Sequence, residues 1–265
     1  NNRDVRLAIN YAIDRKQLST IGYENANYPV VLPYSSYMSG RWITPATQKI
    51  IDKYDRDKTD HQLVAKHMKA AGYDKYGKGL WAKNGETLKV PLRTPQWLAP
   101  LAPPMSVQLK KAGFDASAVL EPEASSAWVD DLKVGNFETM FMVHCGSLGE
   151  PYQTLKDLHS KWSADNKCNS PIACSRYRNE EYDKIIDQLE KIPGSLDDEN
   201  YKTLVNQAVD IYLRDMPEIM LLEELHVVVY NEKYWTNWPG GENPYAAPYP
   251  CWEAWNLIVH NLQPK

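Results

Sequence analysis

"DVRLAINYAIDRKQLSTIGY", residues 4–23, is the segment that decides the fold, because its apolar residues recur with the period of a helix. Asp4 stands directly before the apolar stripe, where a carboxylate can accept hydrogen bonds from the free amides of a helix N-terminus. The segment therefore predicts an amphipathic helix with Asp4 as its N-cap. The apolar stripe consists of Val5, Ala8, Ile9, Ala12 and Ile13.

Segments with a helical period then alternate with segments that are typical of strands. The second helix is expected to begin at Thr59 or Asp60 and to stop at Gly72. This alternation is typical of an α/β fold. Helices are predicted over residues 59–73, 98–113, 125–137, 150–162, 179–192 and 196–216, and strands over residues 85–95, 114–123, 138–145 and 218–231.

The composition excludes several classes of protein. The chain has 265 residues, enough for one large domain or two ordinary ones, and a formal net charge of −4 with both signs mixed. It contains no apolar run long enough to span a membrane and no Lys/Arg run typical of nucleic-acid binding, so neither a membrane span nor a nucleic-acid partner is predicted, although the protein could associate with a membrane. Its aromatic residues are mostly Tyr (17) and Trp (9), rings with polar edges that suit wet, hydrogen-bonding pockets.

No catalytic or cofactor motif is present, so the sequence does not predict an enzyme or a cofactor. It lacks GxSxG, a Walker loop and GxGxxG after a strand, and its histidines and cysteines form no zinc-binding pair. Cys168 and Cys174 enclose five residues that include a proline, a loop that a disulfide can close. We predict this disulfide rather than a metal site, which implies an oxidising compartment. Cys145 and Cys251 could be free or paired.

One aromatic segment is unusual. "YWTNWPGGENPYAAPYPCWEAW", residues 234–255, holds four of the nine tryptophans together with four prolines and few charges. Proline and Gly-Gly indicate a loop. The rings could form a small core beneath that loop, or they could stack on a ligand such as a pyranose ring or a peptide. The segment alone does not decide between these two hypotheses.

Seven motifs, in this order along nearly the whole chain, resemble the large extracytoplasmic solute-binding proteins of ABC importers, which take up peptides, nickel and oligosaccharides. Each motif alone is weak, but their common order is specific. The motifs are "DVRLAINYAIDRKQL" (4–18), "AKHMKAAGYD" (65–74), "LKVPLRTPQ" (88–96), "VQLKKAGFD" (107–115), "DDLKVGNFE" (130–138), "SRYRNEEYDKIIDQL" (175–189) and "DMPEIMLLEE" (215–224).

The resemblance implies a two-lobed, periplasmic-binding-protein-like α/β fold. In that family the first helix lies in the middle of the chain, so this sequence looks like the C-terminal half of a longer protein. Residues 1–216 would form the second lobe, and residues 217–265 would cross the hinge and complete the first. The missing half would carry a signal peptide, and the protein would act outside the cytoplasm with an ABC permease. It would bind its ligand by hinge closure, without chemistry.

The resemblance also bears on the ligand. Peptide-binding members carry an Asp that pairs with the peptide amino group shortly before an "Asp-Pro". Here Glu150-Pro151 matches that pair, and the Asp position falls on Ser147, which is neutral. The aromatic segment is instead similar to the tail of the oligosaccharide-binding branch. We therefore expect an oligosaccharide, with a peptide as the alternative, and nickel or a carbohydrate-active enzyme with two carboxylates as less favoured hypotheses.

The predicted ligand contacts lie at strand ends and in the aromatic segment. Trp97 follows a predicted strand, although it could also pack beneath the next helix. His144 ends another strand, although it could also be a core histidine. The tryptophans of the aromatic segment would stack on sugar rings beside polar partners. The candidates are Trp97, His144, Ser147, Glu224, Trp235, Trp238 and Asn243.

Overall fold

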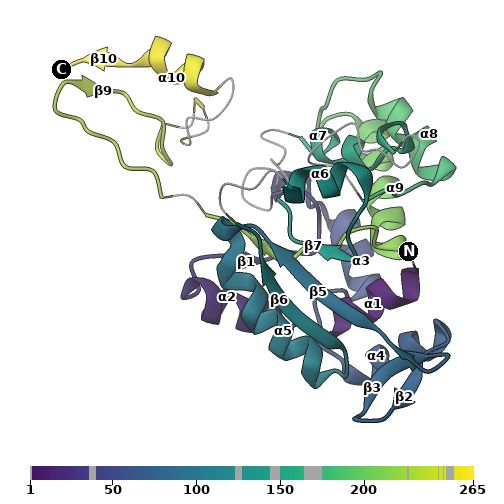
Figure 1. Ribbon diagram of the computed structural model, residues 1–265. Helices are drawn as coiled ribbons and strands as arrows, with labels where there is room; N and C mark the ends of the chain where they lie inside the picture. The colour runs from purple at the N-terminus through teal and green to yellow at the C-terminus, as the bar shows by residue number, and fades with distance from the viewer. Residues whose placement is uncertain are drawn as a thin grey trace. The chain divides into compact units, whose positions relative to one another are not determined.

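The computed structural model divides the chain into two compact units, Asn1–Glu223 and Glu224–Lys265 (Figure 1). The boundary falls after Glu223, whereas the sequence placed the hinge after residue 216. The assignment of the two parts to two lobes stays a prediction. The structure describes residues 2–35, 40–122, 127–143, 150–163, 175–225, 227–243, 245–246, 248 and 254–265.

The first unit contains a three-stranded parallel sheet, in the order β6-β5-β7. The strands are β5 (Lys89–Thr94), β6 (Asp115–Leu120) and β7 (Thr139–Met140). Parallel neighbours need crossover connections, and these are α5 (Ala102–Lys111) and α6 (Ala127–Val134). The predicted α/β class is therefore confirmed. The predicted strand over 138–145 is shorter, because among the described residues only two pair with β5.

The segment that opens the chain forms two helices, not one. α1 (Arg3–Ala12) is capped by Asn2, whose side chain accepts the amides of Asp4 and Val5. The predicted cap at Asp4 is wrong because Asn2 already accepts those amides. Asp14 then accepts the amide of Gln17 and starts α2 (Arg15–Tyr23). A strong N-cap residue directly after the apolar stripe thus ends one helix and starts the next.

The predicted cap at Asp60 is confirmed, because Asp60 accepts two amides at the start of α4 (His61–Ala70). The predicted strand over 85–95 divides into two strands of different sheets. β4 (Glu86–Thr87) closes an antiparallel meander with β2 (Asp74–Tyr76) and β3 (Leu80–Lys83), whereas β5 enters the parallel sheet.

The predicted helix over 98–113 also divides. A 3₁₀ segment, η2 (Gln96–Leu101), precedes α5 because Pro100 cannot donate an amide hydrogen inside a helix. The two prolines of α5 stand in its first turn, where an amide hydrogen would have no partner. Gly113 ends the helix with φ +93°, a conformation that favours glycine.

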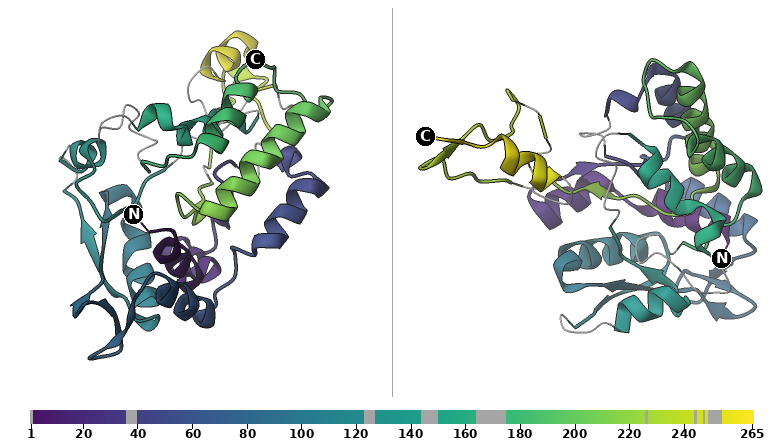
Figure 2. Two further views of the ribbon diagram at one scale, coloured as in Figure 1. Left: turned by 90° about the vertical axis from the view of Figure 1, so that its right-hand side faces the viewer. Right: turned by 90° about the horizontal axis from the view of Figure 1, so that it is seen from above.

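Two apolar cores support the first unit. The first core packs α1, α2, α4 and α5 against the parallel sheet and buries Leu18, Met68, Leu109 and Phe114. The second core packs α3 (Pro45–Tyr54), α7 (Tyr152–Leu155), α8 (Glu180–Leu189) and α9 (Glu199–Asp215) around side chains that include Leu155, Tyr182 and Tyr212. Figure 2 shows α9 in green beside α3 in slate blue. Three 3₁₀ turns complete the unit: η1 (Gly40–Trp42), η3 (Lys156–Leu158) and η4 (Ser160–Trp162).

Four arginines, from α1, α2 and the residue after the cap of α3, donate to residues 213–220, which comprise the end of α9 and the segment after it. Arg3 donates to the carbonyl of Arg214 at 2.8 Å, Arg6 to Met216 at 2.7 Å, Arg56 to Leu213 at 2.9 Å and Arg15 to Met220 at 2.8 Å. Charged donors on main-chain carbonyls make strong hydrogen bonds. They fix the segment that leads into β8 (Leu222–Glu223), which pairs with β1 (Tyr28–Pro29).

The second unit is small and open. β9 (Trp235–Thr236) pairs antiparallel with β10 (Gln263–Pro264), and α10 (Ala254–Asn261) precedes β10. The predicted strand over 218–231 is mostly wrong, since β8 is its only paired part among the described residues. Val227 and Val229 are 91% and 86% exposed, because no described strand lies beside them to bury their apolar side chains.

Candidate ligand-binding site

The carboxyl edge of the parallel sheet is the first part of the candidate site. All three strands point the same way, so their carboxyl ends meet at one edge, where α/β proteins bind ligands. Trp97 follows β5 directly, in η2, and half of its surface (50%) is exposed. The neighbouring strand ends there with Leu120, which is also half exposed and pairs with Thr94. The edge thus presents apolar surface to solvent beside main-chain polar groups.

A charged network lies beneath this edge. Arg93 on β5 donates to Glu121 at 2.5 Å and to Asp131 on α6 at 2.8 Å. A hydrogen bond from Asn136, together with the Arg93 guanidinium, holds the pKa of Asp131 below its usual range, and the bond to Glu121 raises the pKa of Arg93. Arg93 and Asp131 therefore remain ionised, and the three side chains bind one another. None of them was a candidate from sequence, because the partners are separated by 28 and 38 residues.

Glu150 occupies the position that matches the "Asp-Pro" motif, and its carboxylate is already bound. It accepts the amide of Tyr152 at 2.7 Å and the hydroxyl of Tyr201. Burial and the contact with Glu150 raise the pKa of Tyr201, so the phenol stays protonated and keeps donating. Glu150 thus anchors α7 to α9 through its Oε2 atom, which accepts both hydrogen bonds.

Several sequence candidates lie outside the described residues. These are His144 and Ser147, which follow β7 in the sequence, and all four cysteines. The disulfide between Cys168 and Cys174 therefore stays a prediction.

The aromatic candidates lie together in the second unit. Trp238 stacks on Tyr230, with ring centroids 4.5 Å apart and planes inclined by 14°, and its Nε1 donates to the carbonyl of Trp235 at 3.2 Å. Trp235 itself is 48% exposed. The two hypotheses for this segment, a small core and a ligand-stacking surface, thus apply to different rings. Trp238 belongs to a small aromatic core, and Trp235 keeps an exposed ring. Tyr230 was not a candidate, since it closes the apolar run that was read as a strand.

The polar candidates of this unit differ as well. Asn243 exchanges main-chain hydrogen bonds with Gly240, and its side chain donates to Asn237 at 2.7 Å. Its side chain therefore shapes the turn that follows Trp238. Glu224 is exposed at the start of the unit.

The comparison with protein families matches residues 1–166 to the bacterial extracellular solute-binding proteins, family 5, middle region. The chain belongs to this family. No curated protein sequence matched the chain.

Solved structures share the fold of this family 5 protein. The periplasmic oligopeptide-binding protein of an oligopeptide ABC transporter from Thermotoga maritima, solved with mannohexaose, is 24% identical with a TM-score of 0.73, over 99% of this chain and 49% of its own. The Bacillus subtilis oligopeptide-binding protein AppA, solved with a nonapeptide, is 22% identical with a TM-score of 0.65, over 83% and 41%. Campylobacter jejuni NikZ, solved with Ni(L-His), is 18% identical with a TM-score of 0.64, over 83% and 41%. The chain spans about half the length of these proteins or less.

Within the described part of this family 5 chain, no group of three or more His, Cys, Asp or Glu side chains could hold a metal ion. No described helix has the length and apolar character needed to cross a membrane.

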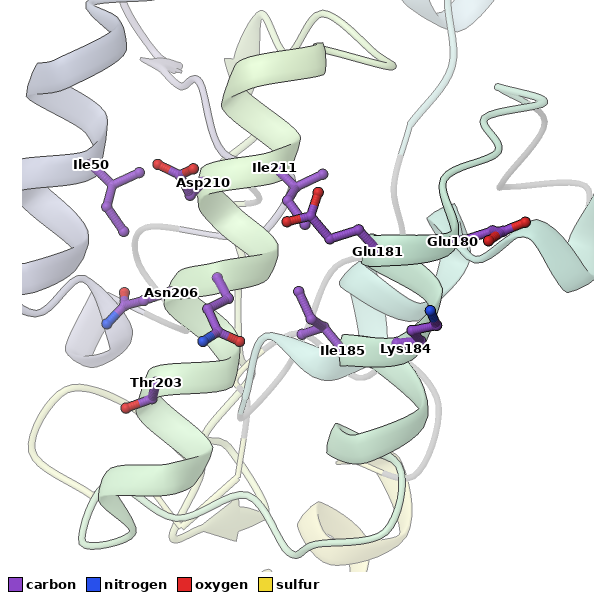
Figure 3. Close-up of a pocket in the computed structure, with 10 residues that line it drawn as sticks. Ile50, Glu180, Glu181, Lys184, Ile185, Thr203, Asn206, Asp210 and Ile211 are labelled. Atoms are coloured by element: carbon purple, nitrogen blue, oxygen red, sulfur yellow. The ribbon is translucent and has the colours of Figure 1, made fainter.

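A groove of about 870 Å³ lies elsewhere, on the outer surface of α3, α8 and α9 (Figure 3). Ile185 and Ile211 are buried beneath it, and Glu181, Lys184 and Asp210 lie on its sides. Lys53 and Arg214 pair with Asp210 and Glu181, so these carboxylates are largely compensated. None of the ligand contacts predicted from the sequence lines this groove.

Proposed function

We propose that this protein is the ligand-binding component of an ABC importer, and that it captures an oligosaccharide in a cleft between two lobes for delivery to a membrane permease. The observation that carries the proposal is the exposed Trp97 ring at the carboxyl edge of the parallel sheet. An indole face can stack on the C–H face of a pyranose, while nearby main-chain groups bind its hydroxyls.

The charge of the site favours a neutral ligand. Arg93, Glu121 and Asp131 are bound to one another. Glu150 is engaged by Tyr152 and Tyr201. Ser147 takes the position at which peptide-binding relatives carry an Asp. An ammonium group would therefore compete with hydrogen bonds that the carboxylates of Glu121, Asp131 and Glu150 already accept within the fold. The mannohexaose bound by the Thermotoga maritima protein is consistent with a sugar oligomer.

The second unit supplies the other wall in this proposal. Residues 1–216 form the second lobe, and residues 217–265 cross the hinge and complete the first lobe with the missing N-terminal half. Trp235 then faces the ligand, while Trp238, which stacks on Tyr230, supports it through its hydrogen bond to the Trp235 carbonyl. A location outside the cytoplasm, a signal peptide in the precursor and the Cys168–Cys174 disulfide belong to the same proposal.

An oligopeptide is the alternative ligand. The Bacillus subtilis protein was solved with a nonapeptide, and the exposed apolar edge at Trp97 and Leu120 would also suit peptide side chains. A peptide would need another acceptor for its amino group, and Glu224 is an exposed carboxylate that could take this role.

Calorimetry of the protein against panels of oligosaccharides and neutral peptides tests the proposal. We expect saturable binding of an oligosaccharide, recovered unchanged. Trp97→Ala should weaken it by roughly tenfold to a hundredfold, since one large ring loses its buried contact. Tyr76→Ala removes an exposed ring at the other end of the sheet and is the matched control. Tight binding of peptides alone would favour the alternative, and hydrolysis of the sugar would indicate an enzyme.

A further inference from the structure

The amino end of the parallel sheet carries a dense set of exposed lysines, which we call the lysine surface. They come from α4, the β2–β3 hairpin, the first residue of β5 and the last turn of α5. All eight are exposed. The lysine surface consists of Lys66, Lys69, Lys75, Lys78, Lys83, Lys89, Lys110 and Lys111.

The fold brings these segments together through the hairpin. Lys75 on β2 donates to the carbonyl of Ala112, directly after α5, at 3.2 Å, and Lys83 on β3 donates to Ala71, directly after α4, at 3.1 Å. The hairpin therefore connects the carboxyl ends of both helices, as its position beside α4 in Figure 1 illustrates. Lys89 joins them because it pairs with Asp115, two residues after the glycine that ends α5.

The charge of this surface is opposite to that of the rest of the chain. Residues 61–89 and 102–115 contain eight lysines and only three acids, Asp74, Glu86 and Asp115, so they carry five net positive charges. The whole chain carries −4, so the remaining residues carry −9. Among the described residues, none of the eight lysines forms an ion pair.

We propose that the lysine surface is where the protein contacts an anionic phospholipid membrane. Helix stability accounts for part of the pattern, because Lys69, Lys110 and Lys111 stand in last turns that favour cations. It does not account for Lys78 at the hairpin tip or for Lys66. Clustered lysines near a surface with anionic lipids are attracted within about a Debye length, roughly 8–10 Å at moderate salt.

Two further features fit a membrane surface better than an acidic protein. Tyr76, at the tip of the hairpin between Lys75 and Lys78, is 67% exposed, and an aromatic ring with a polar edge suits the headgroup region. The surface also lies at the opposite end of β5 from Trp97, so contact with lipid leaves the candidate ligand edge uncovered. The inference goes beyond the proposed transport function and does not depend on which ligand is bound.

Sedimentation with lipid vesicles tests the proposal. The probes are vesicles of equal parts phosphatidylcholine and phosphatidylglycerol, and vesicles of phosphatidylcholine alone. The test variant removes four lysines that make no hydrogen bond to a helix end, and the control removes four exposed lysines elsewhere in the first unit. The test variant is Lys66→Gln, Lys69→Gln, Lys78→Gln and Lys111→Gln, and the control is Lys16→Gln, Lys49→Gln, Lys184→Gln and Lys191→Gln.

The protein and the control variant should bind the mixed vesicles and not the neutral ones, and the test variant should bind at least about tenfold more weakly. Raising the salt from about 0.1 M to 1 M shortens the Debye length to about 3 Å and should release the protein. Circular dichroism checks that both variants are folded. Failure to bind anionic vesicles, equal binding of the two variants, or equal binding to neutral vesicles would each overturn the proposal. In the first case, an acidic protein would become the better partner.

Discussion

The two compact units differ in how they bury large apolar side chains. The first unit encloses two cores, whereas the second has a two-stranded ribbon, one short helix and a pair of stacked rings. Among the described residues sixteen large apolar side chains are exposed, and eight of them lie in the second unit, which holds 42 of the 265 residues. These eight are Leu225, Val227, Val229, Tyr234, Trp235, Trp255, Leu257 and Val259.

This difference shows which part of the chain can stabilise itself. A two-stranded ribbon is at best marginally stable in water, and a segment of about 40 residues rarely buries enough surface to fold alone. We therefore expect the second unit to depend on contacts beyond its own residues. In the proposed function these contacts come from the rest of the first lobe.

The largest expected difference is between a core leucine and an exposed valine. Leu109→Ala removes a fully buried side chain from the first core and should lower the free energy of unfolding by about 2–5 kcal/mol. Val227→Ala removes a side chain that is almost fully exposed and should change it by less than about 0.5 kcal/mol. Urea denaturation of both variants measures the contrast. A large loss at Val227 would show that its side chain is buried in the protein in solution.

Arg15 should give the next largest effect. Its guanidinium is 1% exposed and donates to the carbonyls of Val30, Arg56 and Met220 and to Asn10, and burial lowers its pKa to about 10. Arg15→Met would remove all four of these hydrogen bonds and should cost about 3 kcal/mol of stability in the first unit. Lys16→Met, on the exposed face of α2, is the control.

Hydrogen exchange of the Arg15→Met protein locates the loss. Faster exchange should concentrate in residues 28–31 and 213–223, the segments that Arg15 joins. Exchange in residues 224–265 should stay as it was, because this unit does not share the first unit's cores. A uniform increase over both units would contradict the division into two separately stabilised parts.

The sequence predicted the local features of the first unit well and its long-range contacts poorly. The Asp60 cap, α9, β5 and β6 follow from residues that are close together in the chain. The division into two helices at Asp14 could have been predicted, since Asp is a strong N-cap residue, but the helical period of the apolar residues favoured one continuous helix. Arg15 meets Met220 across 205 residues, and Arg93 meets Asp131 across 38, so neither spacing leaves a pattern. Trp97 became a candidate because it closely follows a strand, and its role in ligand binding stays a prediction.

Asp215 should make the stability of the first unit depend on pH. Burial raises its pKa, but hydrogen bonds from Arg214 and Tyr177 outweigh burial and leave the pKa below its usual range. The ionised carboxylate therefore stabilises the fold. Its contribution is complete above the unfolded pKa of about 3.9 and is lost as the pH falls through the lower folded pKa.

The variant Asp215→Asn should cost about 1–2 kcal/mol at neutral pH, because Tyr177, Asn179 and Arg214 lose a charged acceptor. The difference from the unsubstituted protein should shrink at about pH 3, which urea denaturation at the two pH values measures. Asp197→Asn, at an exposed position before α9, is the control. A difference that is independent of pH would show that shape, not charge, is what Asp215 provides.

The smallest expected effect separates the two tryptophans of the second unit. Trp238→Ala removes the stack on Tyr230 and should cost about 0.5–1.5 kcal/mol, seen as faster hydrogen exchange in residues 224–265. Trp235→Ala should leave that exchange nearly unchanged, since its ring is half exposed, but should weaken ligand binding if the ring faces the ligand. Calorimetry with the best oligosaccharide measures the second effect. Because the two rings are three residues apart and joined by one hydrogen bond, each serves as the control for the other.

Lost affinity at Trp238 with unchanged exchange would reverse the two roles and make Trp238 the stacking ring. Unchanged affinity at both would remove the second unit from the proposed binding site and leave Trp97 as its aromatic contact.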